Sequence, residues 1–204
     1  MSALFKSALA QAELLNRRQI SAVELMQDTL ARIKTINPQV NAIISLREEA
    51  DLLVQAAQAD KSSRTGWMHG LPIAIKDLHD VKDMPSSMGS AIFADYIAEK
   101  DDIAVARVRA AGAIIIGKTN TPEFGLGSHT YNPVHGTTYN PYDLSKSAGG
   151  SSGGAAAALS TRMLPLADGS DMMGSLRNPA AWNNVYGFRP SFGLVPSEPG
   201  AEMF

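Results

Sequence analysis

The first sixty residues carry apolar side chains at the spacing of an α-helix. In the clearest run, the apolar positions are Val23, Met26, Leu30 and Ile33. Ser21 and Glu24 precede this run with the spacing of a capping box, in which each side chain binds the backbone N–H of the other residue. Asn37–Pro38 is expected to end the helix, and a further helix is expected over residues 46–59. The pattern predicts a helical segment over residues 1–64.

From residue 65 onward the pattern changes to short, continuously apolar runs. LPIAI (71–75) and AIII (113–116) each have the length and composition of a buried strand. Between them an amphipathic helix is predicted over residues 103–111, with Gly112 placed to end it. A strand, a helix and a second strand are typical of a parallel α/β unit.

The last part of the chain adds weaker signals of the same kind. Helices are predicted near residues 155–159 and 175–181, and MLPLA (163–167) predicts a third buried strand, which Pro165 weakens. We therefore predict an α/β fold with a mixed β-sheet core, flanked by helices, over residues 65–204. Since the closing SEPGAEMF carries no structural ending, this core is expected to be incomplete at its C-terminus.

Residues 120–154 are rich in Thr, Pro, Asn, Ser and Gly, the composition of loops. A loop of this length inside a compact domain is unusual, and such loops are usually functional. We expect this segment to carry part of a functional site.

Charge and composition exclude several classes of function. Eighteen Lys and Arg oppose twenty Asp and Glu, so the chain lacks the positive surface that would favour nucleic acid or an anionic membrane as a partner. The absence of cysteine excludes a disulfide scaffold, a zinc–thiolate site and a cysteine nucleophile. Charged residues interrupt the apolar N-terminus and no apolar run is long enough to span a bilayer, so a cytoplasmic location is expected.

Two short motifs match the chain without the context that they need. The string from Gly112 to Thr119 fits a phosphate-binding P-loop, but its middle residues are themselves the predicted strand rather than a flexible loop. The string from Gly150 to Gly154 fits the nucleophile elbow of α/β-hydrolases, with Ser152 as nucleophile. The elbow requires a strand directly before it and a later histidine, and all four histidines come earlier in the chain.

A longer set of ordered motifs resembles the amidase signature family over about residues 65–196. The matching stretches are GLPIAIKD (70–77), AAGAIIIGKTNTPEFG (110–125), YNPYDLSKSAGGSSGG (139–154), GGSSGGAAAALSTRMLPLADGSDMMGSLRNPA (149–180) and NNVYGFRPSFGLVP. By position, the resemblance implies that Lys76 is the catalytic lysine, that Ser151 follows a cis peptide bond, and that Ser175 is the acyl-forming nucleophile. It implies a hydrolase that cleaves a carboxylic amide through an acyl-enzyme.

The chemistry is consistent with this assignment. A serine hydroxyl is a weak nucleophile and needs an adjacent base. Lysine can serve as that base when it is neutral, and burial behind apolar residues such as Ile73 and Ile75 would lower its pKa. Ser151 would then take the proton from Ser175 and pass one to Lys76.

The resemblance also implies a set of supporting residues around the nucleophile. Backbone amides of the turn from Met172 to Ser175, which includes Met173 and Gly174, are expected to form the oxyanion hole. The family commonly has glycine where this chain has Met173, so a positive φ there would strain the turn. The positions expected to brace the site are Ser152, Ser170, Asp171 and Arg177. Asp77, next to Lys76, is expected to make an outward structural contact.

Two other functions remain open at this point. The chain could be a truncated, non-catalytic amidase-like fragment. Less favoured is the glutamine-hydrolysing subunit of a tRNA-dependent amidotransferase, because LRNPAAWNNVYGFRP lacks the Gln- and Cys-containing stretch of that subfamily. The expected partner is a small-molecule amide, a homo-oligomer is left open, and neither a metal nor an organic cofactor is implied.

Overall fold

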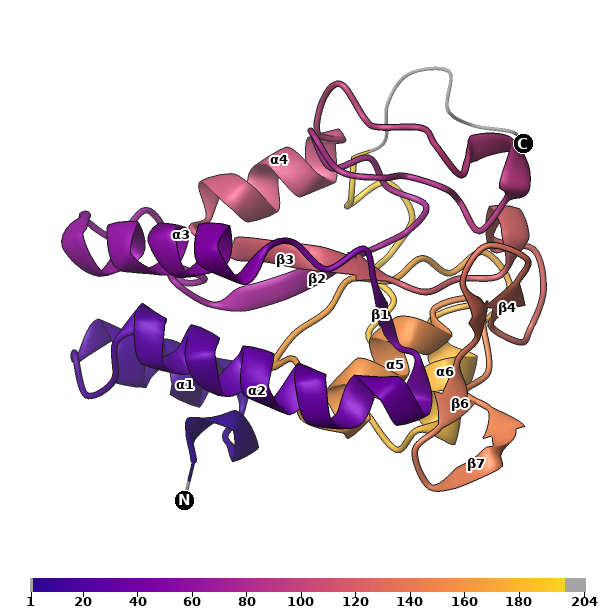
Figure 1. Ribbon diagram of the computed structural model, residues 1–204, viewed down its shortest axis with the longest axis horizontal. Helices are drawn as coiled ribbons and strands as arrows, with labels where there is room; N and C mark the ends of the chain where they lie inside the picture. Colours follow the sequence, from indigo (N-terminus) through magenta and orange to yellow (C-terminus); the bar gives the residue numbers. More distant parts are fainter. Residues whose placement is uncertain (1, 197–204) are drawn as a thin grey trace.

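A computed structural model describes residues 2–196 and confirms the predicted α/β fold (Figure 1). The α-helices are α1 (Ala8–Asn16), α2 (Ala22–Val40), α3 (Glu49–Lys61), α4 (Ile103–Ala110), α5 (Gly153–Ser160) and α6 (Arg177–Trp182). Single 3-10 turns are η1 (Ala3–Phe5), η2 (Ala91–Phe93) and η3 (Glu123–Gly125). The strands are β1 (Ile43–Ile44), β2 (Pro72–Lys76), β3 (Ile114–Thr119), β4 (Tyr131–Asn132), β5 (Gly136–Thr137), β6 (Tyr139–Asn140) and β7 (Asp143–Ser147).

The central sheet is mixed and has the order β1-β3-β2. β2 and β3 run parallel, as the strand–helix–strand pattern predicts, and β1 pairs antiparallel with β3. A register shift between Ile73 and Ala74 leaves Ile75 opposite Lys118 and Lys76 opposite Thr119. This register decides which side chains share a face at the carboxyl ends of the two strands.

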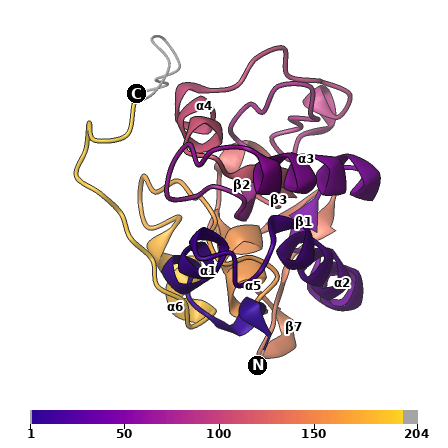
Figure 2. The same cartoon turned by 90° about the vertical axis from the view of Figure 1, so that its left-hand side faces the viewer.

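Helices cover both faces of this sheet (Figure 2). On one face, Ala74, Ile114 and Ile116 pack with apolar residues of α2, α3 and α5. On the other face, Ile73, Ile75 and Ile115 pack with Val105 of α4. Apolar side chains of β2 and β3 are therefore buried on both faces, as expected for continuously apolar strands.

The N-terminal segment confirms one expectation and corrects another. Ser21 and Glu24 form the predicted capping box at the start of α2. The helix continues through Pro38 to Val40, so the predicted end at Asn37–Pro38 was wrong. It ends where Asn41 adopts a left-handed conformation, and the Asn37 side chain binds the backbone just beyond that point.

Helix α3 begins later than predicted because the residues before it, including β1, pair with the sheet. Sequence periodicity placed that helix at 46–59 and no strand before it, whereas α3 begins at Glu49. The residues between α2 and α3 join the sheet instead, and the Arg47 N–H donates to the Ile116 carbonyl at 2.9 Å. Pairing with β3, which sequence periodicity does not show, takes these residues out of the helix.

The third predicted strand, MLPLA, does not form. Its side chains pack on the sheet, but within residues 2–196 its one backbone pairing with a strand is an isolated bridge between Ala74 and Ala167. Pro165 lacks an N–H, and the N–H groups of Met163 and Leu164 bond back to Ala158 at the end of α5. The loop-like segment after residue 120 contains short β-hairpins, β4–β5 and β6–β7, which composition alone did not predict. In residues 2–196, no helix combines the length and apolar character needed to cross a membrane.

Candidate active site

Lys76 is the last residue of β2, and its side chain is completely buried. Its Nζ lies 2.7 Å from Ser151 Oγ, 3.0 Å from Ser152 Oγ and 2.9 Å from Ser170 Oγ. Within residues 2–196 no carboxylate forms an ion pair with this amine. Burial lowers the pKa of Lys76 to about 7, although the charges of Asp168 and Asp171 oppose the shift. A substantial fraction of Lys76 is therefore neutral near pH 7.

A neutral lysine changes the hydrogen bonding among these groups. An ammonium donates three hydrogen bonds, whereas an amine donates two and accepts one. Ser152 Oγ already donates to the Ser170 carbonyl at 3.3 Å. Ser151 Oγ makes the shortest contact with Nζ, and among residues 2–196 it has no other partner. Ser151 is thus the hydroxyl best placed to donate its proton to Lys76.

The glycine-rich segment brings Ser151 to Lys76. The Gly150–Ser151 peptide bond is cis, as the family resemblance implies. A side chain at Gly153 would place its Cβ 2.3 Å from Thr130 Oγ1, and one at Gly154 would place it 2.3 Å from the Asn120 nitrogen. Such distances exclude any side chain, which explains why glycines follow the two serines as α5 begins.

Ser175 lies on a turn beside the same segment. The Ser152 N–H donates to the Ser175 carbonyl at 2.9 Å, which ties the turn to the glycine-rich segment. The Ser175 side chain is half-buried, and its hydroxyl makes no hydrogen bond to any residue between 2 and 196. The structure therefore joins Lys76, Ser151, Ser152 and Ser170 through side chains, and it joins Ser175 to them through the backbone.

Asp171 organises the turn that carries Ser175. Its buried carboxylate accepts hydrogen bonds from the backbone N–H groups of Gly174, Leu176 and Arg177 at 2.8, 3.3 and 3.1 Å. Arg177 also binds it through Nε and Nη2, at 2.8 and 2.9 Å. These bonds, with that to the Arg177 side chain the strongest, hold the pKa of the Asp171 carboxyl well below its usual range. The turn is thus fixed around a charged carboxylate.

The same turn defines which amides are free to bind an oxyanion. The Gly174 N–H is engaged by Asp171, whereas the N–H groups of Met172, Met173 and Ser175 have no partner within residues 2–196. Met173 is not among the residues with positive φ, so the methionine is not strained there. Gly174 has a φ of 111°, and a Cβ on it would lie 2.8 Å from Asn178 Nδ2. The glycine requirement therefore falls on Gly174.

Comparisons with known proteins identify the family of this chain. The family model described as Amidase matches residues 24–204. The chain belongs to the amidase signature family. Its curated relatives include one of the subunits of the glutamyl-tRNA(Gln) amidotransferase of Coxiella burnetii, 46% identical over 89% of this chain, and the indoleacetamide hydrolase of Bradyrhizobium diazoefficiens, 41% identical over 96%. This chain spans 38% of the length of each of these relatives.

Solved structures of amidase signature proteins have the same fold. A bacterial aryl acylamidase of the family matches 97% of this chain with a TM-score of 0.90 and 33% identity, and the match covers 42% of that enzyme. The 6-aminohexanoate cyclic dimer hydrolase in complex with its substrate matches 88% of this chain with a TM-score of 0.80 and 35% identity, over 36% of its own length. The described part of this chain therefore corresponds to a portion of a larger amidase structure.

Sequence reasoning assigned one residue beside the candidate site wrongly and missed others. Asp77 is buried and pairs with the equally buried Lys118 at 3.0 Å, so the expected outward contact was wrong. Lys118 belongs to β3, which confirms that the P-loop-like string is a strand. Asp168, which sequence reasoning missed, accepts a hydrogen bond from the Lys76 backbone N–H at 2.7 Å. The available signal was an acidic residue shortly before Ser175, the predicted nucleophile.

A nucleophile elbow at Ser152 requires a strand directly before that residue. The residues before Ser152 do form a strand, β7, but it ends at Ser147 and belongs to an exposed hairpin rather than to the central sheet. The strand is therefore not directly before Ser152. Among residues 2–196, no group of three His, Cys, Asp or Glu side chains is arranged to hold a metal ion.

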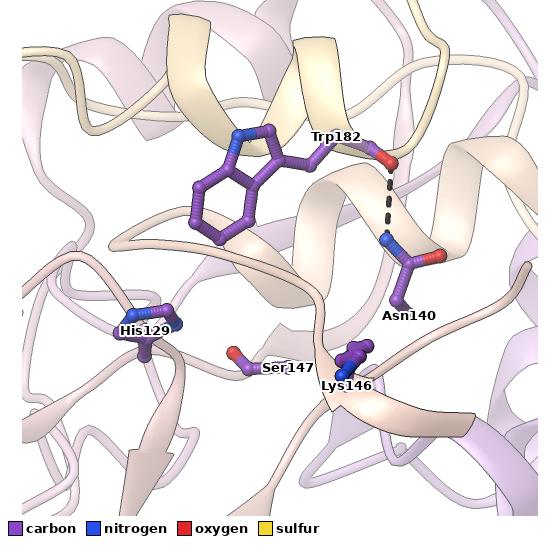
Figure 3. A pocket seen from close by; sticks show the side chains of 5 residues that line it. All are labelled: His129, Asn140, Lys146, Ser147 and Trp182. Carbon is purple, nitrogen blue, oxygen red and sulfur yellow. Dashed lines mark hydrogen bonds between the residues drawn. The ribbon is translucent and has the colours of Figure 1, made fainter. Parts of the chain in front are cut away.

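A surface pocket of about 510 Å³ borders the segment that leads to Ser151 (Figure 3). It is lined by His129, Asn140, Lys146, Ser147 and Trp182. The rings of His129 and Trp182 have centroids 5.5 Å apart, and Asn140 Nδ2 donates to the Trp182 carbonyl at 3.0 Å. The pocket thus presents aromatic and hydrogen-bonding groups next to the glycine-rich segment of the candidate site.

Proposed function

We propose that this chain carries the catalytic residues of an enzyme that hydrolyses a carboxylic amide to an acid and ammonia or an amine. The contact that carries the proposal is the 2.7 Å approach of the buried Lys76 Nζ to Ser151 Oγ. The lowered pKa of Lys76 supports its role as a base. No cofactor enters the proposed reaction.

The proposed reaction begins with attack of Ser175 Oγ on the amide carbonyl carbon. Ser151 takes the Ser175 proton while it passes its own proton to neutral Lys76. The oxyanion that forms would be bound by the free backbone amides of Met172, Met173 and Ser175. When the C–N bond breaks, the relay runs in reverse and protonates the leaving nitrogen. Water then attacks the Ser175 ester, and the acid is released.

The supporting residues have distinct parts in this proposal. Ser152 and Ser170 accept hydrogen bonds from Lys76 and hold its amine toward Ser151. Asp171, neutralised by Arg177, fixes the turn and takes up the Gly174 N–H, so Gly174 supplies a backbone conformation rather than an oxyanion donor. We infer a small-molecule amide as substrate, and the cysteine-free sequence fits a cytoplasmic location. A homo-oligomer stays a prediction.

A fluorophosphonate probe tests the assignment of the nucleophile. We expect intact-mass spectrometry to show a single adduct on the purified protein, and peptide mapping to place it on Ser175. Ser175→Ala should remove the adduct, and Ser152→Ala should keep it. An adduct on Ser152 would support the nucleophile-elbow mechanism instead. No adduct on a protein that unfolds cooperatively would support the non-catalytic fragment, and a thermal melt supplies that control.

A second candidate function is glutamine hydrolysis within a tRNA-dependent amidotransferase. The observation that favours it is the 46% identity with a chain of the glutamyl-tRNA(Gln) amidotransferase. The same site would release ammonia from glutamine. Ammonia production from glutamine, compared with acid production from a panel of simple amides, separates the two functions. Co-purification of the other amidotransferase chains would favour the glutamine-dependent reaction.

A further inference from the structure

The backbone of Lys76 is held on both sides by groups that can carry charge. Asp168 Oδ1 accepts the Lys76 N–H at 2.7 Å, and the backbone N–H of His79 donates to the Lys76 carbonyl at 3.0 Å. Asp168 directly follows Ala167, whose bridge to Ala74 brings this part of the chain to the edge of β2. The carboxylate thus fixes the lysine strand to the segment that leads to Ser175, but it also brings a negative charge to Lys76.

The imidazole of His79 lies between two carboxylates. Its Nδ1 is 3.2 Å from Asp102 Oδ2, and its Nε2 is 3.8 Å from Asp168 Oδ2. Asp102 also accepts the Asp80 N–H at 3.1 Å, which fixes it against the turn after β2. Burial and the charge of Lys76 lower the pKa of His79, but the hydrogen bond with Asp102 and the charges of Asp168 and Asp102 outweigh them and raise it above the ordinary value.

The charges that face the Lys76 amine decide how readily it loses its proton. Asp168 and Asp171 both favour the ammonium form, against burial. Asp171 is paired with Arg177, and Asp77, the neighbour of Lys76 in the chain, is paired with Lys118. For Asp168, the one side chain among residues 2–196 placed to form an ion pair is His79, when its imidazole is protonated. A protonated His79 would therefore weaken the effect of Asp168 on Lys76.

We propose that His79 is a positioning residue whose charge balances Asp168, so that Asp168 can hold the backbone of Lys76 without keeping the lysine amine protonated. The inference rests on the proposed role of Lys76 as the base. The two residues have separate roles. Asp168 holds the Lys76 backbone through a hydrogen bond, and His79 offsets the negative charge that would otherwise raise the pKa of the Lys76 amine. Asp102 orients His79 and favours its protonated form.

The test follows the ionisation of Lys76 directly, without reference to activity. The purified protein is labelled with ¹³C-lysine, and the Lys76 resonance is identified by its loss in Lys76→Met. We expect His79→Asn to raise the pKa of Lys76 by about one unit, the scale of a nearby uncompensated charge. Asp168→Asn keeps a carbonyl that can accept the Lys76 N–H, and it should lower the pKa. The double variant should return close to the unmodified protein.

Two further variants serve as a supporting measurement and a control. Asp102→Asn removes the partner whose hydrogen bond raises the pKa of His79, so it should raise the pKa of Lys76, as His79→Asn does. His129→Asn removes an exposed histidine that does not contact Lys76, and it should leave the titration unchanged. An unchanged or lowered Lys76 pKa in folded His79→Asn and Asp102→Asn would overturn the proposal, because a purely structural histidine would not move this titration upward.

The acid limb of kcat/KM against pH gives a second reading. It should move in the same direction and by a similar amount as the NMR titration in each variant. If the NMR titration shifts as expected while no variant hydrolyses an amide, the charge balance stands and the proposed function fails. If hydrolysis depends on Ser175 but neither the acid limb nor the NMR titration shifts, the function stands and the role of His79 fails.

Discussion

Two lysines lie at the carboxyl ends of neighbouring strands of the sheet, and the structure surrounds them in opposite ways. Lys76 of β2 and Lys118 of β3 are both completely buried. Lys118 Nζ lies 3.0 Å from an Asp77 carboxylate oxygen and 2.9 Å from Ser86 Oγ. Lys76 Nζ is surrounded by serine hydroxyls, and its pKa is lowered to about 7. Burial is the same for the two amines, so the difference lies in their partners.

The register of the sheet explains why Asp77 serves one lysine and not the other. Side chains alternate between the faces of a strand, so Lys76 and Asp77 point to opposite faces although they are adjacent in sequence. Lys118 is opposite Ile75 and therefore shares a face with Asp77. The backbone thus delivers the carboxylate to Lys118 and leaves Lys76 with neutral partners. A buried amine without a paired carboxylate is suited to accept a proton.

Among the variants that test this contrast between the two lysines, removal of the Lys76 amine should have the largest effect, and that effect should be on turnover. We expect Lys76→Met to lower turnover about 10²–10⁴-fold, the usual contribution of a general base. Lys34→Met removes an exposed lysine on α2 and serves as the matched control, with unchanged turnover. Steady-state hydrolysis of an amide substrate measures both. Full turnover in Lys76→Met would exclude this lysine from the mechanism.

At Lys118 the expected effect falls on stability. Asp77→Asn leaves a buried ammonium without its carboxylate, which should reduce the free energy of unfolding by about 3–5 kcal/mol. Adding Lys118→Met should recover much of the loss, because the unpaired charge is then gone. Glu13→Gln breaks the exposed Glu13–Arg17 pair, and it should cost less than about 1 kcal/mol. Urea unfolding measures all of these, and a change below about 1 kcal/mol in Asp77→Asn would contradict the pairing.

Elements that depend on local sequence patterns could be predicted, whereas elements that depend on pairing with distant residues could not. The strands β2 and β3 and the capping box at Ser21 depend on local patterns, and each was predicted correctly. Strand β1 has two residues and exists through its pairing with β3, which no local pattern reveals. The failed strand at 163–167 was apolar enough, but Pro165 and the bonds back to α5 kept it out of the sheet.

For the site, motif resemblance selected Lys76 and Ser151, and the structure brings them into contact. It did not identify Asp168, because the hydrogen bond to Lys76 joins positions 92 residues apart. It assigned Asp77 wrongly because the face on which that side chain lies depends on the register between strands. Residue types at fixed local spacing are readable from the sequence, whereas partners fixed by packing are not.

The lowered pKa of Lys76 should also appear in the pH dependence of stability. Between the folded pKa of about 7 and the unfolded value near 10.5, the unfolded chain binds the proton more strongly. The free energy of unfolding should therefore rise with pH across this window, with a Lys76 contribution that approaches about 1.4 kcal/mol per pH unit. Below about pH 7 that contribution should be flat. Denaturant unfolding of the unmodified protein and of Lys76→Met, compared from about pH 6 to 10, isolates it, and parallel curves would contradict it.

The smallest expected effects come from removing one hydroxyl beside each lysine. Ser152→Ala leaves Lys76 with Ser151 and Ser170, so turnover should fall less than about tenfold, which corresponds to about 1.4 kcal/mol. Ser86→Ala leaves Lys118 paired with Asp77, so it should cost about 1 kcal/mol of stability and leave turnover unchanged. Amide hydrolysis and urea unfolding of the two variants measure these changes. If Ser152→Ala lost as much turnover as Ser175→Ala, the hydroxyl beside Lys76 would be the nucleophile itself, and the contrast between the two lysines would no longer explain the chemistry.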